Sequence, residues 1–234
     1  MTERPALLLV HGAWHGPWCW EPLKALLEND GWRVGTVDLP SVAPATAPRH
    51  GMYDDASAVR AAIEEIGGPV VVVAHSYGGI PVTEGAAGLP GVEHLVYVAA
   101  FQIDVGDSLL STIGGTPPPW WQVDGEVIRP LTPETVFFND VGDAPVDRLE
   151  TQSYAAVTDR LTQAAWHTVG STYVVCENDN AIPVFAQDAM AQRATSVQRL
   201  PPGHSPFLSR PAELAAIITT AAVTLPRRSS PASG

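Results

Sequence analysis

The sequence predicts an α/β fold: a mostly parallel sheet of about six strands, with helices on both faces and a small cap. Short apolar runs of strand length alternate along the chain with longer segments whose apolar residues follow a helical spacing. One run, Val70–Val73, holds four consecutive valines, which is typical of a strand buried on both faces of a parallel sheet. The alternation stops after Phe101 and returns near Ser171, which predicts an insertion between two strands.

Size and composition fit one large globular domain. The chain has 234 residues, of which 45% are hydrophobic and 16% charged. Its 13 basic and 25 acidic side chains give a net charge of −12. Such a surface repels nucleic acid and anionic lipid, so we expect neither as a partner. Cys19 and Cys176 have no metal or redox spacing and are expected to be two buried thiols, although the sequence leaves a disulfide open.

The sequence also gives an expectation about location. No stretch approaches the roughly 20 apolar residues that a membrane helix needs. The apolar run Ala6–Val10 is too short for the core of a secretion signal. We therefore expect a cytoplasmic protein. The oligomeric state stays open, because no distinctive surface patch can be recognised.

Strands and helices alternate through the first half of the chain. Residues Leu39–Gly51 contain three prolines and are predicted to form a loop. The other segments are assigned from their apolar spacing and their flanking glycines. The predicted strands are Ala6–Val10, Trp32–Asp38, Val70–Val73 and His94–Ala100, and the predicted helices are Pro17–Asn29, Tyr53–Ile66 and Gly79–Ala87.

The insertion, residues 104–165, is predicted to be a cap or lid, because insertions of this length between two strands are usually functional. Within it, Val123–Val127 is predicted to be a hairpin turn, and Asp140–Arg160 to be partly helical. The alternation then returns with the strands Ser171–Cys176 and Ser196–Leu200 and the helices Val184–Arg193 and Pro211–Val223. Residues 1–103 and 166–225 are thus the predicted core, and the Pro/Ser-rich residues 226–234 a flexible tail.

Ser76 lies between the valine strand and a predicted helix, in the sequence Ala74-His75-Ser76-Tyr77-Gly78. This is close to the G-x-S-x-G motif of a nucleophile elbow, a turn so tight that the positions two before and two after the serine must be small. Gly78 keeps the second of these positions, and Ala74 adds one methyl group at the first. Taken alone, the pentapeptide fits a nucleophile elbow and an ordinary turn with a solvated serine equally well.

Two further strand ends supply partners for this serine. Ligands bind at the carboxyl ends of the strands in such a sheet, where the last two predicted strands deliver Asp179 and His204. The chain order Ser…Asp…His is the one expected for an α/β-hydrolase. His204 would take the serine proton as general base, and Asp179 would hold the imidazole tautomer. Glu177 and Asp104 compete with Asp179 for the acid role.

The loop after the first predicted strand suggests an oxyanion hole. Gly12 lets the backbone turn directly after the strand, so the N–H groups of Ala13 and Tyr77 would point at the developing oxyanion. His11 and His75 are expected to orient loops by hydrogen bonds. Four aromatic residues either line the substrate pocket or pack beneath the cap: Trp14, Trp120, Trp121 and Phe207.

These motifs carry a resemblance. Residues 8–20, LLVHGAWHGPWCW, resemble the opening of the methylesterase and hydroxynitrile-lyase branch of the α/β-hydrolases, which includes bacterial esterases of the pyrethroid-hydrolase type. Ala74–Gly79, Tyr97–Phe101, Asp179–Pro183 and Gly203–Phe207 are similar to further motifs of that branch. The resemblance implies a Ser-His-Asp hydrolase that needs no cofactor or metal and cleaves small carboxylic esters through an acyl-enzyme.

Three positions depart from this branch. Its lyases carry Lys directly after the histidine, where this chain has Ser205, and Thr where it has Gly12. Both differences favour an esterase. Members often have an acidic residue between the glycine and the histidine of the last loop, whereas Gly203 directly precedes His204.

Other functions remain open on the same fold. They are cyanohydrin cleavage, hydrolysis of a specific lactone, and ligand binding by a receptor with little turnover. Haloalkane dehalogenases and epoxide hydrolases need Asp as the nucleophile, so Ser76 argues against both.

Overall fold

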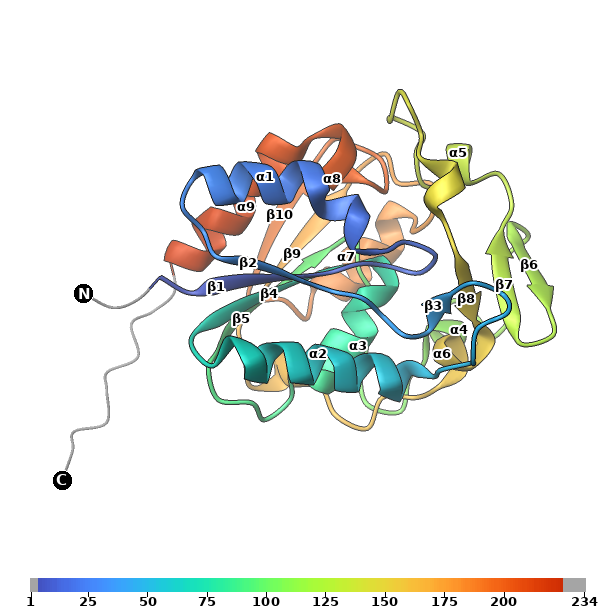
Figure 1. Cartoon of the computed structure of the whole chain (residues 1–234), viewed down its shortest axis with the longest axis horizontal. Helices are drawn as coiled ribbons and strands as arrows, with labels where there is room; N and C mark the ends of the chain where they lie inside the picture. Colours follow the sequence, from blue (N-terminus) through green and yellow to red (C-terminus); the bar gives the residue numbers. More distant parts are fainter. Residues whose placement is uncertain (1–3, 225–234) are drawn as a thin grey trace.

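The computed structural model describes residues 4–224, and within them the larger sheet has six strands, all parallel, in the order β10-β9-β5-β4-β1-β2. Helices cover both faces of this sheet (Figure 1), which confirms the predicted fold class. The predicted tail, residues 226–234, lies outside the described residues. The strands are β1 (Ala6–Val10), β2 (Val34–Val37), β4 (Val70–His75), β5 (Val92–Val98), β9 (Ser171–Cys176) and β10 (Ser196–Leu200).

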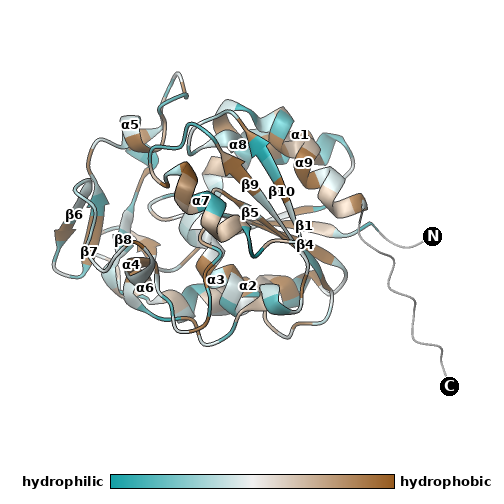
Figure 2. Cartoon of the chain, turned by 180° about the vertical axis from the view of Figure 1, so that it is seen from behind, coloured by the Kyte–Doolittle hydropathy of each residue, from teal (hydrophilic) through white to brown (hydrophobic). Residues whose placement is uncertain are grey.

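The core lies on both sides of the central strands. Successive side chains of a strand point to opposite faces, so each strand supplies two hydrophobic clusters. Leu7 and Leu9 of β1 belong to one cluster, and Leu8 and Val10 to the other. The edge strand β10 is mostly exposed and carries mainly hydrophilic colour in Figure 2. The continuous apolar runs therefore mark the buried strands.

Two groups of helices cover the two faces of the sheet (Figure 1). On one face lie η1 (Pro17–Trp20), α1 (Glu21–Asn29), α8 (Pro206–Ser209) and α9 (Pro211–Val223). On the other lie α2 (Met52–Ile66), the short η2 (Ser76–Gly78), α3 (Gly79–Gly85) and α7 (Val184–Ala191). The predicted helices are present, while the four-residue α8 was not expected.

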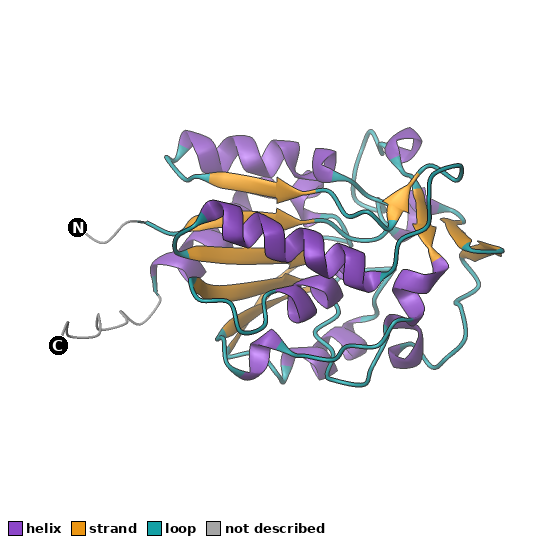
Figure 3. Ribbon diagram, turned by 60° about the horizontal axis from the view of Figure 1, so that its bottom comes forward, coloured by secondary structure: helices purple, strands orange, loops and turns teal. Residues whose placement is uncertain are grey.

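A smaller antiparallel sheet, in the order β3-β8-β7-β6, lies beyond the carboxyl ends of the parallel strands (Figure 3). The predicted hairpin is confirmed as β6 and β7. The elements of this region are β3 (Val42–Ala43), α4 (Leu109–Thr112), β6 (Trp121–Asp124), β7 (Val127–Pro130), α5 (Pro133–Val136), η3 (Val146–Arg148), β8 (Thr151–Ser153), α6 (Tyr154–Thr158) and η4 (Ala165–His167).

One sequence prediction is wrong in this region. Strand β3 lies in the segment Leu39–Gly51, which was predicted to be entirely loop. The segment Asp140–Arg160 is partly helical as predicted, with η3 and α6, but it also contains the unexpected strand β8. Both strands are only two or three residues long, and they pair with each other, Val42 opposite Gln152. Local propensity cannot reveal a pairing between segments so far apart in the chain.

The strand order creates a switch point between β1 and β4. From β1 the chain crosses to β2 on one side, whereas β4 and the later strands lie on the other side. A crevice forms at the carboxyl ends of strands where the winding direction reverses, and ligands bind there. The loops after β1 and β4 carry Ala13 and Ser76 to this point.

Two smaller expectations can be checked here. Cys19 and Cys176 are both free and buried, as expected. Among the helices of the described residues, none combines the length and the apolar character needed to span a membrane.

The buried β1 strand provides a stability test. Leu9 is 0% exposed, so Leu9→Ala should lower the free energy of unfolding by about 2–5 kcal/mol, measured by urea denaturation. The matched control is Leu26→Ala on α1, where the leucine is 37% exposed and alanine keeps the helix propensity, so the loss should stay below about 1 kcal/mol. Equal losses in the two variants would contradict the assigned core.

Candidate active site

Ser76 occupies a strained turn directly after β4. Its φ angle is +52°, in the left-handed region that side-chain-bearing residues rarely adopt. Such strain persists only where the surroundings enforce it, and it is common at functional sites. The residue is half-buried and lines a cavity, which favours the nucleophile elbow over the alternative of an ordinary turn with a solvated serine.

Close packing against β1 enforces this turn. A Cβ atom at Gly78 would lie 2.4 Å from the carbonyl oxygen of His11 and 2.9 Å from that of Val10. A Cβ atom at Gly12 would lie 2.8 Å from the Ser76 Cβ. Both positions therefore require glycine, because the turn and the first-strand loop approach each other too closely for a side chain.

His204 and Asp179 form a buried pair. The Nδ1 atom of His204 lies 2.8 Å from Oδ2 of Asp179, and both side chains are almost fully buried. The backbone N–H groups of Ala181 and Ile182 donate to the other oxygen of Asp179, at 2.7 and 3.0 Å. An ionised carboxylate accepts from Nδ1–H, which leaves Nε2 of a neutral His204 free to accept a proton.

The two competing acids are engaged elsewhere. Asp104 pairs with His167 at 2.9 Å, and Glu177 pairs with Arg199 at 3.6 Å. All four of these side chains are substantially exposed. Asp179 is thus the acid that geometry associates with His204.

His75 joins the histidine loop to the serine turn. Its Nε2–H donates to the carbonyl oxygen of His204 at 2.9 Å, and the two imidazole centroids are 4.5 Å apart. His11 makes a similar loop contact: its Nε2 accepts from the N–H of Leu39 at 3.1 Å. Both histidines thus orient loops, which was their expected role. His75 directly precedes Ser76, so its contact with His204 holds the histidine loop beside the serine turn.

Burial keeps two of the neighbouring imidazoles neutral. It lowers the pKa of His15 to about 3, with a smaller contribution from the nearby His204. Burial likewise lowers the pKa of His75 well below its usual value. The Nδ1–H of His15 donates to the Ala13 carbonyl at 2.9 Å, which fixes the loop that carries one of the predicted oxyanion donors.

A cavity of about 640 Å³ opens in front of Ser76. Ala13 and Tyr77, the two predicted oxyanion residues, line it together with Ser76. Its aromatic wall includes Trp14, Trp120, Trp121 and Phe137, with the other three rings 5.4–5.7 Å from the Trp14 ring. Aliphatic side chains complete the lining, among them Leu109, Ile113, Ile182 and Met190.

Phe207 does not line this cavity, contrary to one of the two sequence interpretations. It is 0% exposed and packs 4.8 Å from both Trp20 and His75, in the cluster on the α1 and α9 side of the sheet. The reason is that Phe207 lies in α8, which turns back over that face directly after the histidine loop.

Two residues beyond the predicted set hold the loops of Asp179 and His204. The Asn139 side chain donates to the carbonyl of Asn178 at 2.9 Å, and Asp140 accepts from the N–H of Gly203 at 2.9 Å. Each contact falls on the residue preceding a member of the pair. Asp140 thus places a carboxylate beside the loop in which members of the resembled branch often carry an acidic residue and this chain does not. No local sequence signal could have indicated contacts of such long range.

No group of three or more His, Cys, Asp or Glu residues is placed to hold a metal ion within residues 4–224.

Comparisons with known proteins agree with this geometry. The family model described as the alpha/beta hydrolase family matches residues 7–217. The alpha/beta hydrolase nvfD of Aspergillus novofumigatus is 29% identical over 248 residues, covering 94% of this chain and 97% of that protein. Methylesterase 7 of Arabidopsis thaliana is 28% identical over 251 residues, covering 93% and 96%.

A solved structure shows the same fold. The pyrethroid hydrolase from Sphingobium faniae JZ-2 superposes with a TM-score of 0.83 at 23% identity, covering 94% of this chain and 98% of that one. Together these findings confirm the predicted resemblance to methylesterases and pyrethroid-hydrolase-type esterases.

The buried neutral His15 predicts a pH effect on stability. Its pKa is lowered in the folded state, so the unfolded chain binds the extra proton, and stability falls as pH drops from about 6.5 towards about 3. His15→Asn can still donate to the Ala13 carbonyl but cannot titrate. The variant should therefore lose less stability between about pH 6 and pH 4, by up to about 1.4 kcal/mol per pH unit. Urea denaturation at each pH measures this, and parallel curves for the two proteins would contradict it.

Proposed function

This chain belongs to the alpha/beta hydrolase family, and we propose that it hydrolyses small carboxylic esters with Ser76, His204 and Asp179 as its catalytic triad. The observation that carries the proposal is the buried 2.8 Å pair of His204 and Asp179, tied through His75 to the strained turn at Ser76. A strained serine at a cavity, a base and an orienting acid make up the constellation needed for nucleophilic catalysis.

The first half of the reaction forms the acyl-enzyme. Ser76 Oγ attacks the ester carbonyl while His204 Nε2 takes its proton, and Asp179 stabilises the resulting imidazolium. The carbonyl oxygen becomes an oxyanion, which accepts hydrogen bonds from the N–H groups of Ala13 and Tyr77; each such donor is typically worth about 10²–10³ in rate. The tetrahedral intermediate collapses, and the alcohol leaves with the proton from His204.

The second half releases the acid. His204 takes a proton from a water molecule, whose oxygen attacks the acyl carbon, and then returns the proton to Ser76 Oγ as the carboxylic acid leaves. No step needs a cofactor.

The cavity suggests the kind of ester. Its walls are mainly aromatic and aliphatic, which favours a substrate with an apolar group beside the carbonyl. Residues 104–165 form the proposed cap, which supplies Trp120, Trp121 and Phe137 to the cavity wall. The names of the relatives, a methylesterase and a pyrethroid hydrolase, also support ester substrates. A cytoplasmic location remains a prediction.

The first test is the identity and reactivity of the nucleophile. A fluorophosphonate should add one adduct to the wild type, detected by intact mass, and none to Ser76→Ala. Turnover of short-chain p-nitrophenyl esters should fall at least about 10³-fold in Ser76→Ala and by a similar factor in Asp179→Asn. Ser57→Ala, an exposed serine on α2, is the matched control and should behave as wild type. Wild-type turnover in Ser76→Ala would refute the mechanism, and cyanide release from mandelonitrile would instead indicate a lyase.

The second test concerns the pocket. Trp120 lines the cavity and is only partly buried, so Trp120→Ala should enlarge the cavity without disrupting the core. In Trp120→Ala we expect the ratio of kcat/KM for an octanoyl ester to kcat/KM for an acetyl ester to rise about 10-fold over the wild type. One methylene group that the enlarged cavity accommodates is worth about 1–3 kcal/mol at most. Measuring both esters with each protein gives this ratio, and an unchanged ratio would place the acyl group elsewhere.

A further inference from the structure

Asp55 of α2 is a fully buried carboxylate that the proposed mechanism does not use. Its hydrogen-bond partners within the described residues are uncharged groups. Burying a carboxylate in this way is unfavourable unless hydrogen-bond donors replace the lost water. The position of these donors therefore indicates what the carboxylate holds in place.

Three donors point at Asp55. The backbone N–H of Ser41 donates to Oδ1 at 2.8 Å, while the hydroxyls of Ser41 and Tyr77 donate to Oδ2 at 2.5 and 2.6 Å. Hydrogen bonds to a charged acceptor are short and strong. Burial raises the pKa of Asp55 to about 6, while the bonds from Ser41 and Tyr77 and the nearby His11 act to lower it.

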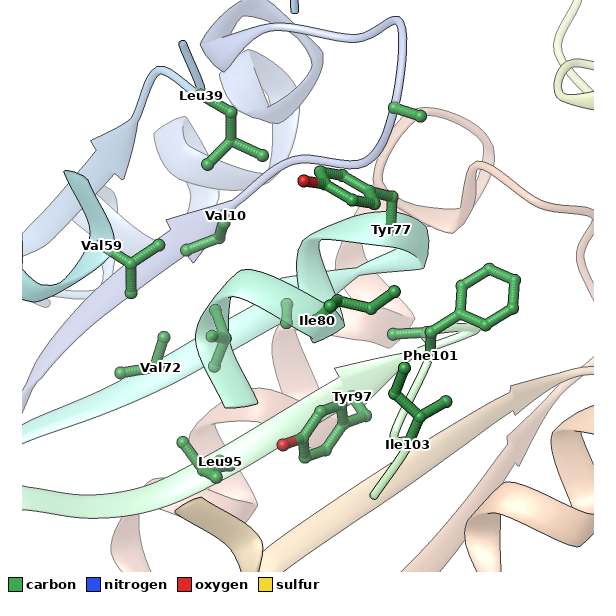
Figure 4. Close-up of a cluster of buried hydrophobic side chains, with 14 of the residues drawn as sticks. Val10, Leu39, Val59, Val72, Tyr77, Ile80, Leu95, Tyr97, Phe101 and Ile103 are labelled. Carbon is green, nitrogen blue, oxygen red and sulfur yellow. The ribbon is translucent and has the colours of Figure 1, made fainter. Parts of the chain in front are cut away.

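One of the donors belongs to the nucleophile turn. Tyr77 directly follows Ser76, is 0% exposed, and supplies one of the two proposed oxyanion N–H groups. Figure 4 shows its ring among the buried side chains of the core, with the hydroxyl directed towards the side where Val10 and Leu39 lie. The bond to Asp55 fixes the ring, and through the ring it limits rotation of the main chain that carries the N–H.

The other two donors belong to Ser41, which lies at the contact with the proposed cap. Ser41 precedes β3, and its carbonyl accepts from the N–H of Ser153 at 2.9 Å. Its hydroxyl accepts from the side-chain amide of Gln152 at 2.7 Å. Gln152 and Ser153 belong to β8, an inner strand of the smaller sheet, so the same carboxylate ties this strand to the core through Ser41.

We propose that Asp55 is a positioning residue, which aligns the Tyr77 N–H with the oxyanion and ties strand β8 of the cap to the nucleophile turn. This inference rests on the proposed function. Oxyanion donors must lie about 2.7–3.1 Å from the developing charge, and a displacement of about 1 Å can lower the rate about 10²-fold. Loss of the Asp55 carboxylate should lower kcat and leave KM nearly unchanged, because the oxyanion exists only in the transition state and the intermediates.

The test uses Asp55→Asn, Tyr77→Phe and the double variant. Asparagine keeps the shape of the side chain but removes its charge, so the charge-assisted hydrogen bonds with the hydroxyls of Ser41 and Tyr77 are replaced by weaker neutral ones. Turnover of p-nitrophenyl acetate is divided by the amount of Ser76 labelled with fluorophosphonate, so that an unfolded fraction does not count. Asp55→Asn should lower kcat about 10–100-fold with KM changed by less than about 3-fold. Tyr77→Phe should lower it less, and the double variant should be no worse than Asp55→Asn.

Tyr97→Phe is the matched control. Tyr97 is also 0% exposed and lies in β5 opposite Ala74, but its hydroxyl contacts Thr83 of α3 instead of Asp55. It should lose stability comparably to Tyr77→Phe and keep its kcat. If Asp55→Asn retained kcat within about 2-fold, or if Tyr97→Phe lost as much activity, the positioning role would be refuted. A wild-type protein without adduct or turnover would instead refute the proposed function.

Hydrogen exchange provides a readout that does not depend on activity. In Asp55→Asn the amides of residues 76–79 and 151–153 should both exchange faster than in the wild type, while those of β9 should not. Faster exchange in only one of the two segments would contradict the link between the cap and the turn.

Discussion

The close approach of the β4 turn to the end of β1 is the constraint on which the site depends. The main chain at Gly78 lies so near the carbonyls of Val10 and His11 that a side chain cannot be accommodated. This packing holds Ser76 in its left-handed conformation and at the same time brings Gly12 and Ala13 beside it. The proposed nucleophile and the proposed oxyanion loop are therefore positioned by one contact between neighbouring parallel strands. Because both strands are fully buried, the sheet itself supports the strain.

The region beyond the sheet contributes hydrogen bonds as well as a pocket wall. Trp14, whose φ angle is also positive, donates from its indole N–H to the carbonyl of Ile128 and accepts at its own carbonyl from Glu150. Asn139 and Asp140 hold the loops that carry Asp179 and His204. Each of these contacts reaches a loop at the carboxyl end of the sheet. The region that contains the smaller sheet is thus joined by hydrogen bonds to the loops that carry the proposed catalytic residues.

The sequence was informative where structure depends on local pattern. The valine run, the alternation of strands and helices, and the order of Ser76, Asp179 and His204 along the chain predicted the parallel sheet and the residues at its carboxyl edge. It was uninformative where a residue's position depends on distant partners. The β3–β8 pair, the Asn139 and Asp140 contacts and the burial of Phe207 all arise from tertiary packing. Asp55 illustrates the same limit: near the start of a helix an acidic residue suits the dipole, and only the fold shows that it is buried against Tyr77.

The neutrality of the surrounding imidazoles follows from this packing and bears on the chemistry. In the proposed mechanism His204 takes the serine proton and becomes a cation, while the ring of His75 lies 4.5 Å away. If His75 were also charged, the repulsion would be about 4 kcal/mol at an effective dielectric constant of 20. Trp20 and Phe207 pack against His75 and help to keep it dry, and burial holds its pKa far below neutrality. The apolar packing around His75 therefore has an electrostatic effect. It keeps a second cation away from His204, so the attraction between the imidazolium and Asp179 is not offset by repulsion.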